Sequence, residues 1–113
     1  MVSPVDIVQR QLDAYNDHDL ERFLANFSDT IKVFRMPTLE PSLVGKAQLS
    51  DFYATQRFNR PALRAQLLSR IVCGNKVIDH ERIWGMGEHA IETVGVFEVV
   101  DGLIQTSWFF AAG

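Results

Sequence analysis

Residues 97–104 read FEVVDGLI, a run of β-branched and aromatic residues with Asp101-Gly102 near its centre. Asp-Gly between two such runs predicts a tight type I′ hairpin, because both central residues of that turn need positive φ angles. Gly74-Asn75 predicts a second hairpin, of type II′, and residues 85–88 form a looser turn between the two. Residues 62–110 are therefore expected to form a four-stranded antiparallel meander.

The chain before this meander carries mainly helical signals. Capping residues and apolar residues at spacings of three and four predict helices there. The expected elements are helices from Ser3-Pro4 to near Asn16, from Asp19 to near Ser28 or Asp29 and over Lys46–Arg57, with a strand over Ile31–Met36. Helices first and mainly strands afterwards is typical of the α+β class.

Length and composition limit the class of protein. A chain of 113 residues predicts one domain, spanning residues 1–113, and a net charge of -3 offers no basic surface to nucleic acid. No apolar run reaches the roughly 18 residues of a membrane span, so we expect a cytoplasmic protein without a membrane partner. The single cysteine, Cys73, is expected to be a reduced, buried thiol.

The hairpin turns also predict which side chains lie opposite one another, since a two-residue loop sets the pairing. The opposed pairs counted from residues 74–75 are Arg70 with Asp79, Ser69 with His80, and Leu67 with Arg82. The face that carries His80, Arg82 and Trp84 has fewer charges than the reverse face. We therefore expect it to be the inner face, turned toward the helices.

The last hairpin sets a second group of opposed side chains. Counting from residues 101–102 places Phe97 opposite Thr106 and Gly95 opposite Trp108, on the more apolar face. The reverse face keeps further apolar residues, among them Val94, Val96, Val100, Leu103 and Phe109. An apolar outer face of this size predicts a homodimer.

Several segments together resemble the nuclear transport factor 2-like superfamily, which includes ketosteroid isomerases, SnoaL-like cyclases and limonene epoxide hydrolases. The segments are Ile7-Val8-Gln9-Arg10 running on to Tyr15-Asn16-Asp17-His18-Asp19-Leu20, then Phe27-Ser28-Asp29, Gly45 before Phe52-Tyr53, and residues 97–104. The resemblance implies a cystatin-like cone, in which a curved, mostly antiparallel sheet wraps three helices around a pocket. It also implies a dimer.

The resemblance gives positions for known catalytic groups. The ketosteroid isomerase tyrosine falls at Gln11, its base at Arg35 and its protonated aspartate at Gly95. The arginine of limonene epoxide hydrolases matches Arg82, while Trp84 and Phe109 or Trp108 stand where its two aspartates are expected. The usual catalytic acids of both enzymes are therefore missing.

The predicted site combines a titratable base, cations and an aromatic wall. His80 is the candidate acid or base, and Arg35 or Arg82 is the candidate group that stabilises negative charge. The candidate ligand-binding residues are Tyr15, Tyr53, Arg82, Trp84, Phe97 and Trp108. The alternatives are a structural His80, a solvated Arg35 and tyrosines that are core rings. No metal site and no cofactor are expected.

Two functions remain open. One is an enzyme for proton transfer, as in steroid delta-isomerases, or for cyclisation or hydrolysis, acting on an apolar carbonyl compound. The other is a non-catalytic dimeric module that binds a ligand or a protein. A roomy cavity with His80 at its wall favours the enzyme with its small apolar ligand, whereas a dry, collapsed interior favours the module.

Overall fold

The computed structural model describes residues 2–113 and shows the helices before the long strands, as the sequence predicts. Its elements are α1 (Pro4–Asn16), α2 (Leu20–Leu24), β1 (Phe27–Arg35), β2 (Leu43–Val44), α3 (Lys46–Gln56), β3 (Arg64–Cys73), β4 (Lys76–Trp84), β5 (Ile91–Val100) and β6 (Leu103–Ala111). The strands form one sheet in the order β2-β1-β6-β5-β4-β3. The α+β class and the antiparallel meander β3 to β6 are confirmed.

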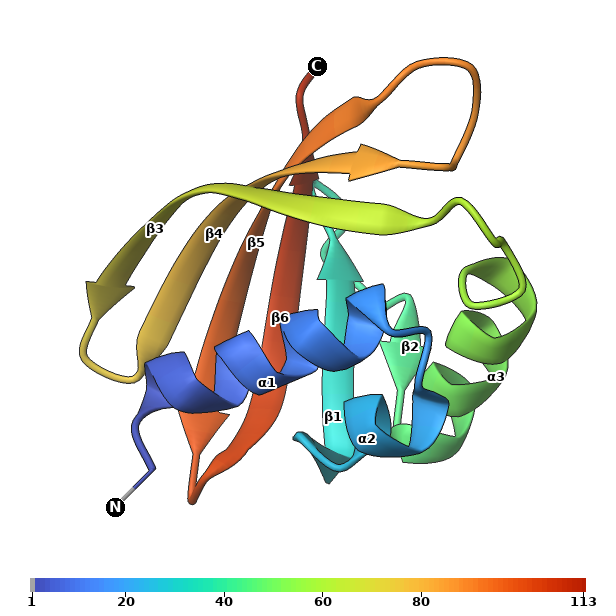
Figure 1. Ribbon diagram of the computed structural model, residues 1–113. Coiled ribbons are helices and arrows are strands. Elements are labelled where there is room, and N and C mark those ends of the chain that lie inside the picture. Colours follow the sequence, from blue (N-terminus) through green and yellow to red (C-terminus); the bar gives the residue numbers. More distant parts are fainter. Residues whose placement is uncertain (1) are drawn as a thin grey trace.

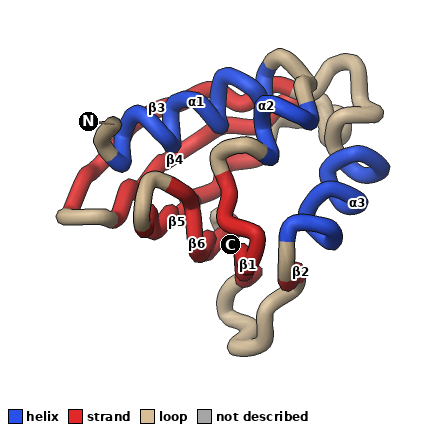
Figure 2. The backbone as a smooth tube through the Cα atoms, turned by 90° about the horizontal axis from the view of Figure 1, so that it is seen from below, coloured by secondary structure: helices blue, strands red, loops and turns tan. Residues whose placement is uncertain are grey.

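Helix α1 lies across the concave side of the curved sheet, with α2 and α3 following it toward the β1 end (Figures 1 and 2). Its start is a reciprocal capping box, in which the backbone of Asp6 donates to Ser3 and the backbone of Ser3 donates to Asp6. The helix buries Val8 and Leu12 against the sheet. This contact defines the inner face of the sheet. No helix within residues 2–113 has the length and apolar character that crossing a bilayer requires.

Three local expectations were wrong. Helix α2 ends at Leu24 because the Asn26 side chain donates to the carbonyl of Arg22, and strand β1 then begins at Phe27, earlier than expected. Residues 43–44 form strand β2 where no strand was expected, since they pair with β1. Cys73 is exposed, because it lies at the tip of the first hairpin.

Both tight turns have the predicted conformation. In the first turn Gly74 has a positive φ of 59° and Asn75 has no positive φ. In the second turn Asp101 and Gly102 both have positive φ angles, of 52° and 78°. In the loop after β4, Gly85 adopts a φ of 89°, and a Cβ atom there would lie 2.4 Å from the backbone of Ala62. Only glycine fits this close approach of the two segments.

A bulge in β3 changes which side chains of that strand face inward, while β4 alternates without interruption. Ser69 lies opposite His80 as predicted, but Leu67 lies opposite Glu81 and not Arg82. On β4 the buried residues are Val77, Asp79 and Glu81. The predicted inner face was therefore wrong: His80, Arg82 and Trp84 alternate with these residues and lie on the outer face. The charged face can be buried because Arg70 pairs with Asp79.

A second bulge, at Glu98 and Val99, has the same effect on β6. Phe97 pairs with Ser107 and Gly95 pairs with Phe109, whereas the prediction paired them with Thr106 and Trp108. Phe109 consequently lies on the inner face, where its ring contacts that of Phe97. Trp108 lies on the outer face and stacks on Phe34, with the ring centroids 6.2 Å apart.

Candidate functional site

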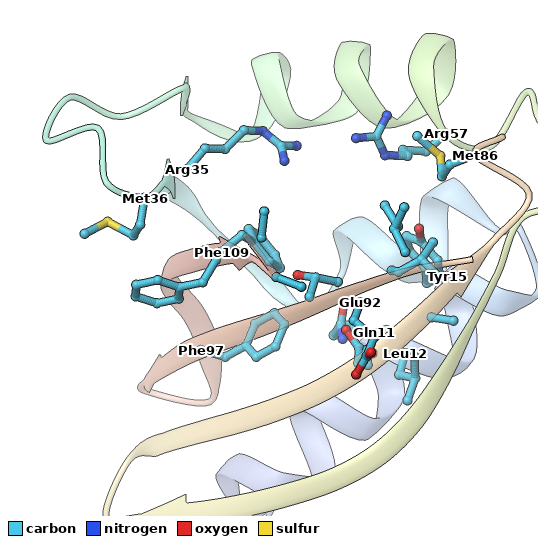
Figure 3. A pocket seen from close by; sticks show the side chains of 18 of the residues that line it. Gln11, Leu12, Tyr15, Arg35, Met36, Arg57, Met86, Glu92, Phe97 and Phe109 are labelled. Atoms are coloured by element: carbon cyan, nitrogen blue, oxygen red, sulfur yellow. The ribbon is translucent and has the colours of Figure 1, made fainter. Parts of the chain in front are cut away.

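A cavity of about 530 Å³ lies between the inner face of the sheet, α1 and α3. Its floor consists of the buried lining residues, Gln11, Leu12, Tyr15, Tyr53, Ala65, Glu81 and Phe97. Its rim consists of exposed or half-buried lining residues, chiefly Arg35, Met36, Arg57, Met86, Ile91 and Glu92. Figure 3 shows Arg35 and Arg57 on the α3 side, across the cavity from Gln11, Phe97 and Phe109. The site is thus an apolar chamber with polar groups on opposite walls.

Glu81 is the carboxyl group of the floor. Strand β4 brings it to the inner face, where it is 6% exposed, and its Oε2 atom has no hydrogen-bond partner among residues 2–113. Burial and, to a lesser extent, the nearby charge of Asp79 raise the pKa of the Glu81 carboxyl, Arg70 opposes them, and the net result is a pKa of about 7. Near neutral pH the carboxyl therefore occurs in both protonation states, as a general acid or base requires.

The other buried carboxylate of β4 is fully paired. Arg70 donates to Asp79 through Nε at 2.7 Å and through Nη2 at 3.0 Å, and its Nη1 donates to Gln9 on α1 at 2.9 Å. Asp79 and Glu81 are two residues apart and so share one face of the strand. Because the guanidinium is committed to Asp79, Glu81 is the carboxyl left free to exchange a proton with a ligand.

Tyr15 and Tyr53 supply two phenols to the floor. Their rings meet edge to face, with centroids 6.3 Å apart, in an aromatic cluster that includes Phe23 and Phe58. Burial raises the pKa of both phenols. Their hydroxyl groups therefore stay protonated at ordinary pH and are available as hydrogen-bond donors.

Arg35 and Arg57 supply two cations to the rim. Arg35 ends β1 and Arg57 caps α3, and their guanidinium carbons lie 5.3 and 4.7 Å from the ring centroid of Phe52. Neither forms an ion pair with a carboxylate of residues 2–113. This side of the cavity therefore carries positive charge that the described part of the chain does not neutralise.

A model of the SnoaL-like domain matches residues 8–106. The chain belongs to this family. Solved structures similar to this SnoaL-like domain include Delta 5-3-ketosteroid isomerase from Mycobacterium sp., with 23% identity over 96% of this chain and 92% of that one and a TM-score of 0.81. A SnoaL-like protein from Burkholderia thailandensis has 20% identity over 97% and 94% of the two chains and a TM-score of 0.82.

A cystatin-fold protein from Novosphingobium aromaticivorans has 15% identity over 96% of this chain and 98% of that one, with a TM-score of 0.85. No match was found among curated proteins. The predicted nuclear transport factor 2-like superfamily and cystatin-like fold are thereby confirmed. At these identities the neighbours establish the fold of this SnoaL-like domain, and its chemistry has to be argued from its own residues.

The structure places four predicted site residues of this SnoaL-like domain on the cavity wall: Arg35, Tyr15, Tyr53 and Phe97. Arg82, Trp84 and Trp108 are on the outer face and do not line the cavity. His80 is also on the outer face, where its Nε2 lies 2.6 Å from Glu92 Oε1 and its side chain is 41% exposed. The assignment of His80 as acid or base stays a prediction, and the cavity does not support it because His80 is not among its lining residues.

Sequence reasoning missed Glu81 and Arg57. The signal for Glu81 was the opposed pair of Arg70 and Asp79, since a neutralised Asp79 allows the charged face of β4 to turn inward. Gln11 and Arg35, which the resemblance aligned with a tyrosine and a base, do line the cavity, but neither supplies those groups. Within residues 2–113, no three side chains of His, Cys, Asp or Glu gather as metal ligands.

Proposed function

We propose that this SnoaL-like domain binds an apolar carbonyl compound and moves a proton within it, with Glu81 as base and then acid. The observation that carries the proposal is a buried carboxyl in the wall of a cavity, with one oxygen that lacks a protein partner. Buried polar groups are ordinarily hydrogen-bonded, so an unpartnered one in a cavity wall favours a ligand as its partner.

The chemistry follows from the groups on the floor. The Glu81 carboxylate accepts a proton from the carbon next to the carbonyl, while the C–H electron pair forms a C=C bond and the carbonyl π electrons move to oxygen. The Tyr15 or Tyr53 hydroxyl stabilises the enolate oxygen by donating a hydrogen bond. In a β,γ-unsaturated carbonyl compound the enolate extends over the second double bond, so Glu81 returns the proton to the γ-carbon while the carbonyl re-forms, which completes an isomerisation. In a cyclisation the enolate carbon attacks a second carbonyl, whose oxygen takes the proton from Glu81. In a hydrolysis Glu81 takes a proton from water, the water oxygen attacks the carbonyl, and the proton passes from Glu81 to the leaving group.

Deuterium exchange tests this role. In D₂O the protein should speed exchange at the carbon beside the ketone of β-benzoylpropionate, followed by proton NMR, and Glu81→Gln should slow the catalysed rate by roughly a hundredfold or more. Glu98→Gln, on the outer face of β5, is the matched control and should keep the rate. Exchange no faster than in buffer, or a Glu81→Gln rate equal to that of the unmodified protein, would contradict the proposal.

The outer face of the sheet supports a second copy of this chain as partner. Register places Ile78, Val96, Trp108 and Phe34 in one row across β4, β5, β6 and β1, and Phe110 beside it is 41% exposed. Such a continuous apolar row is typical of a subunit interface. A non-catalytic dimeric module would use the same face, and it differs from the enzyme in showing no exchange.

The homodimer should appear in light scattering as twice the 12.8 kDa mass of the chain. Val96→Glu places a charge in the middle of the apolar row and should shift the protein to monomers at micromolar concentration. Ala54→Glu, at an exposed site of α3, should leave the mass unchanged. If the unmodified protein is a monomer at this concentration, the proposed dimer is wrong.

A further inference from the structure

We infer that the natural ligand carries an anionic group, of the carboxylate kind, and that Arg35 and Arg57 hold it at the rim of the cavity while its apolar body and carbonyl reach Glu81. This inference deepens the proposed function, because it names the substrate class of the same site. It rests on three observations: the two arginines have no carboxylate partner among the described residues, their guanidinium groups are held in place, and the cavity changes from charged at the rim to mainly apolar on the floor.

The first argument is the charge on the α3 side. Arg57 is half-buried, and burial lowers its pKa, with the neighbouring charge of Arg35 adding to the effect. Because two neighbouring guanidinium groups repel each other, an anion bound between them lowers the electrostatic energy. The nearby rim carboxylate, Glu92, is bound to His80 at 2.6 Å. The described residues therefore leave the positive charge for a ligand to neutralise.

The second argument is that the cations are held in place. Phe52 lies under both guanidinium groups, and Arg57 Nη1 also donates to the carbonyl of Gln56 at 2.9 Å. Guanidinium groups fixed in this way lose less freedom on binding, and their planar forks match the two oxygens of a carboxylate. Both extend toward the space of the cavity (Figure 3).

The third argument is the order of groups from rim to floor. The cations are at the rim, whereas Leu12 and Phe97 are on the floor beside Glu81. A ligand with a carboxylate at one end and an apolar ketone at the other matches this order, because its charge stays near water while its apolar part is buried. A neutral ketone would leave the cations unpaired.

Calorimetric titration with β-benzoylpropionate and its amide tests the inference, since the two differ only in the charged group. The acid should bind at least roughly tenfold more tightly. Arg57→Gln should weaken the acid by roughly tenfold, and Arg35→Gln, at a more exposed site, by less. Both should change the amide little. Arg64→Gln, an exposed arginine outside the cavity, is the control and should bind both as before.

Equal binding of acid and amide, failure of the acid to bind at millimolar concentration, or equal weakening of both probes by Arg57→Gln would overturn the inference. Glu81→Gln separates it from the proposed function. If this variant and the unmodified protein both prefer the acid while neither exchanges deuterium, the anion site stands and proton transfer fails. If exchange occurs on acid and amide alike, proton transfer stands and the anion site fails.

Discussion

Arg70→Ala is expected to lower the free energy of unfolding by about 3–5 kcal/mol, because it leaves a buried carboxylate without its partner. Asp79 is fully buried, and Arg70 is the group that donates two hydrogen bonds to it. Urea denaturation at neutral pH measures the loss. The pair of Lys76 and Glu98, 3.3 Å apart with side chains 41% and 26% exposed, gives the control, since Lys76→Ala should cost less than about 1 kcal/mol.

The double variant Arg70→Met, Asp79→Leu separates the charge from the packing. It removes both ions and keeps an apolar filling, so most of the lost stability should return. A cost below about 1 kcal/mol for Arg70→Ala, or a double variant as unstable as the single one, would contradict a buried ion pair beneath α1. Either result would also weaken the argument that Asp79 occupies Arg70 and leaves Glu81 free.

Glu81→Gln is expected to stabilise the protein at pH 8 by up to about 3 kcal/mol and to have little effect at pH 4. Burial raises the pKa of the carboxyl from 4.5 to about 7, so the folded state holds the proton more tightly than the unfolded state. Below the unfolded pKa both states are protonated and there is no cost. Stability falls as pH rises from the unfolded pKa of 4.5 to the folded pKa of about 7. Above the folded pKa the full cost of a buried charge remains.

The measurement is the difference in unfolding free energy between Glu81→Gln and the unmodified protein, taken across this pH range. Subtracting the two curves removes the contributions of other carboxylates, which act in the opposite direction. A flat difference for Glu81→Gln would mean that the carboxyl is not buried as the structure has it. A gain in stability with a loss of activity would mark Glu81 as a functional group.

The sequence by itself determined the local elements of this SnoaL-like domain. The capping box at Ser3, the type I′ turn at Asp101-Gly102 and the hairpin at Gly74-Asn75 depend on residues within a few positions of one another. The cavity residues Tyr15 and Tyr53 were also predicted, because apolar spacing on a helix shows which ring turns inward. Arg35 was named as well, although its direction was left open.

Only the tertiary structure decided which faces of β4 and β6 turn inward. In β6 one extra residue, opposite Glu98 and Val99, reverses every side chain beyond it, and it shows only when the strands pair. Strand β4 alternates without interruption, so packing alone decided which of its two faces is buried. Burial of the charged face of β4 required Arg70, Asp79 and Gln9 to meet from three separate elements. That meeting puts Glu81 into the cavity and His80 outside it, because charge can be buried only where packing provides its partner.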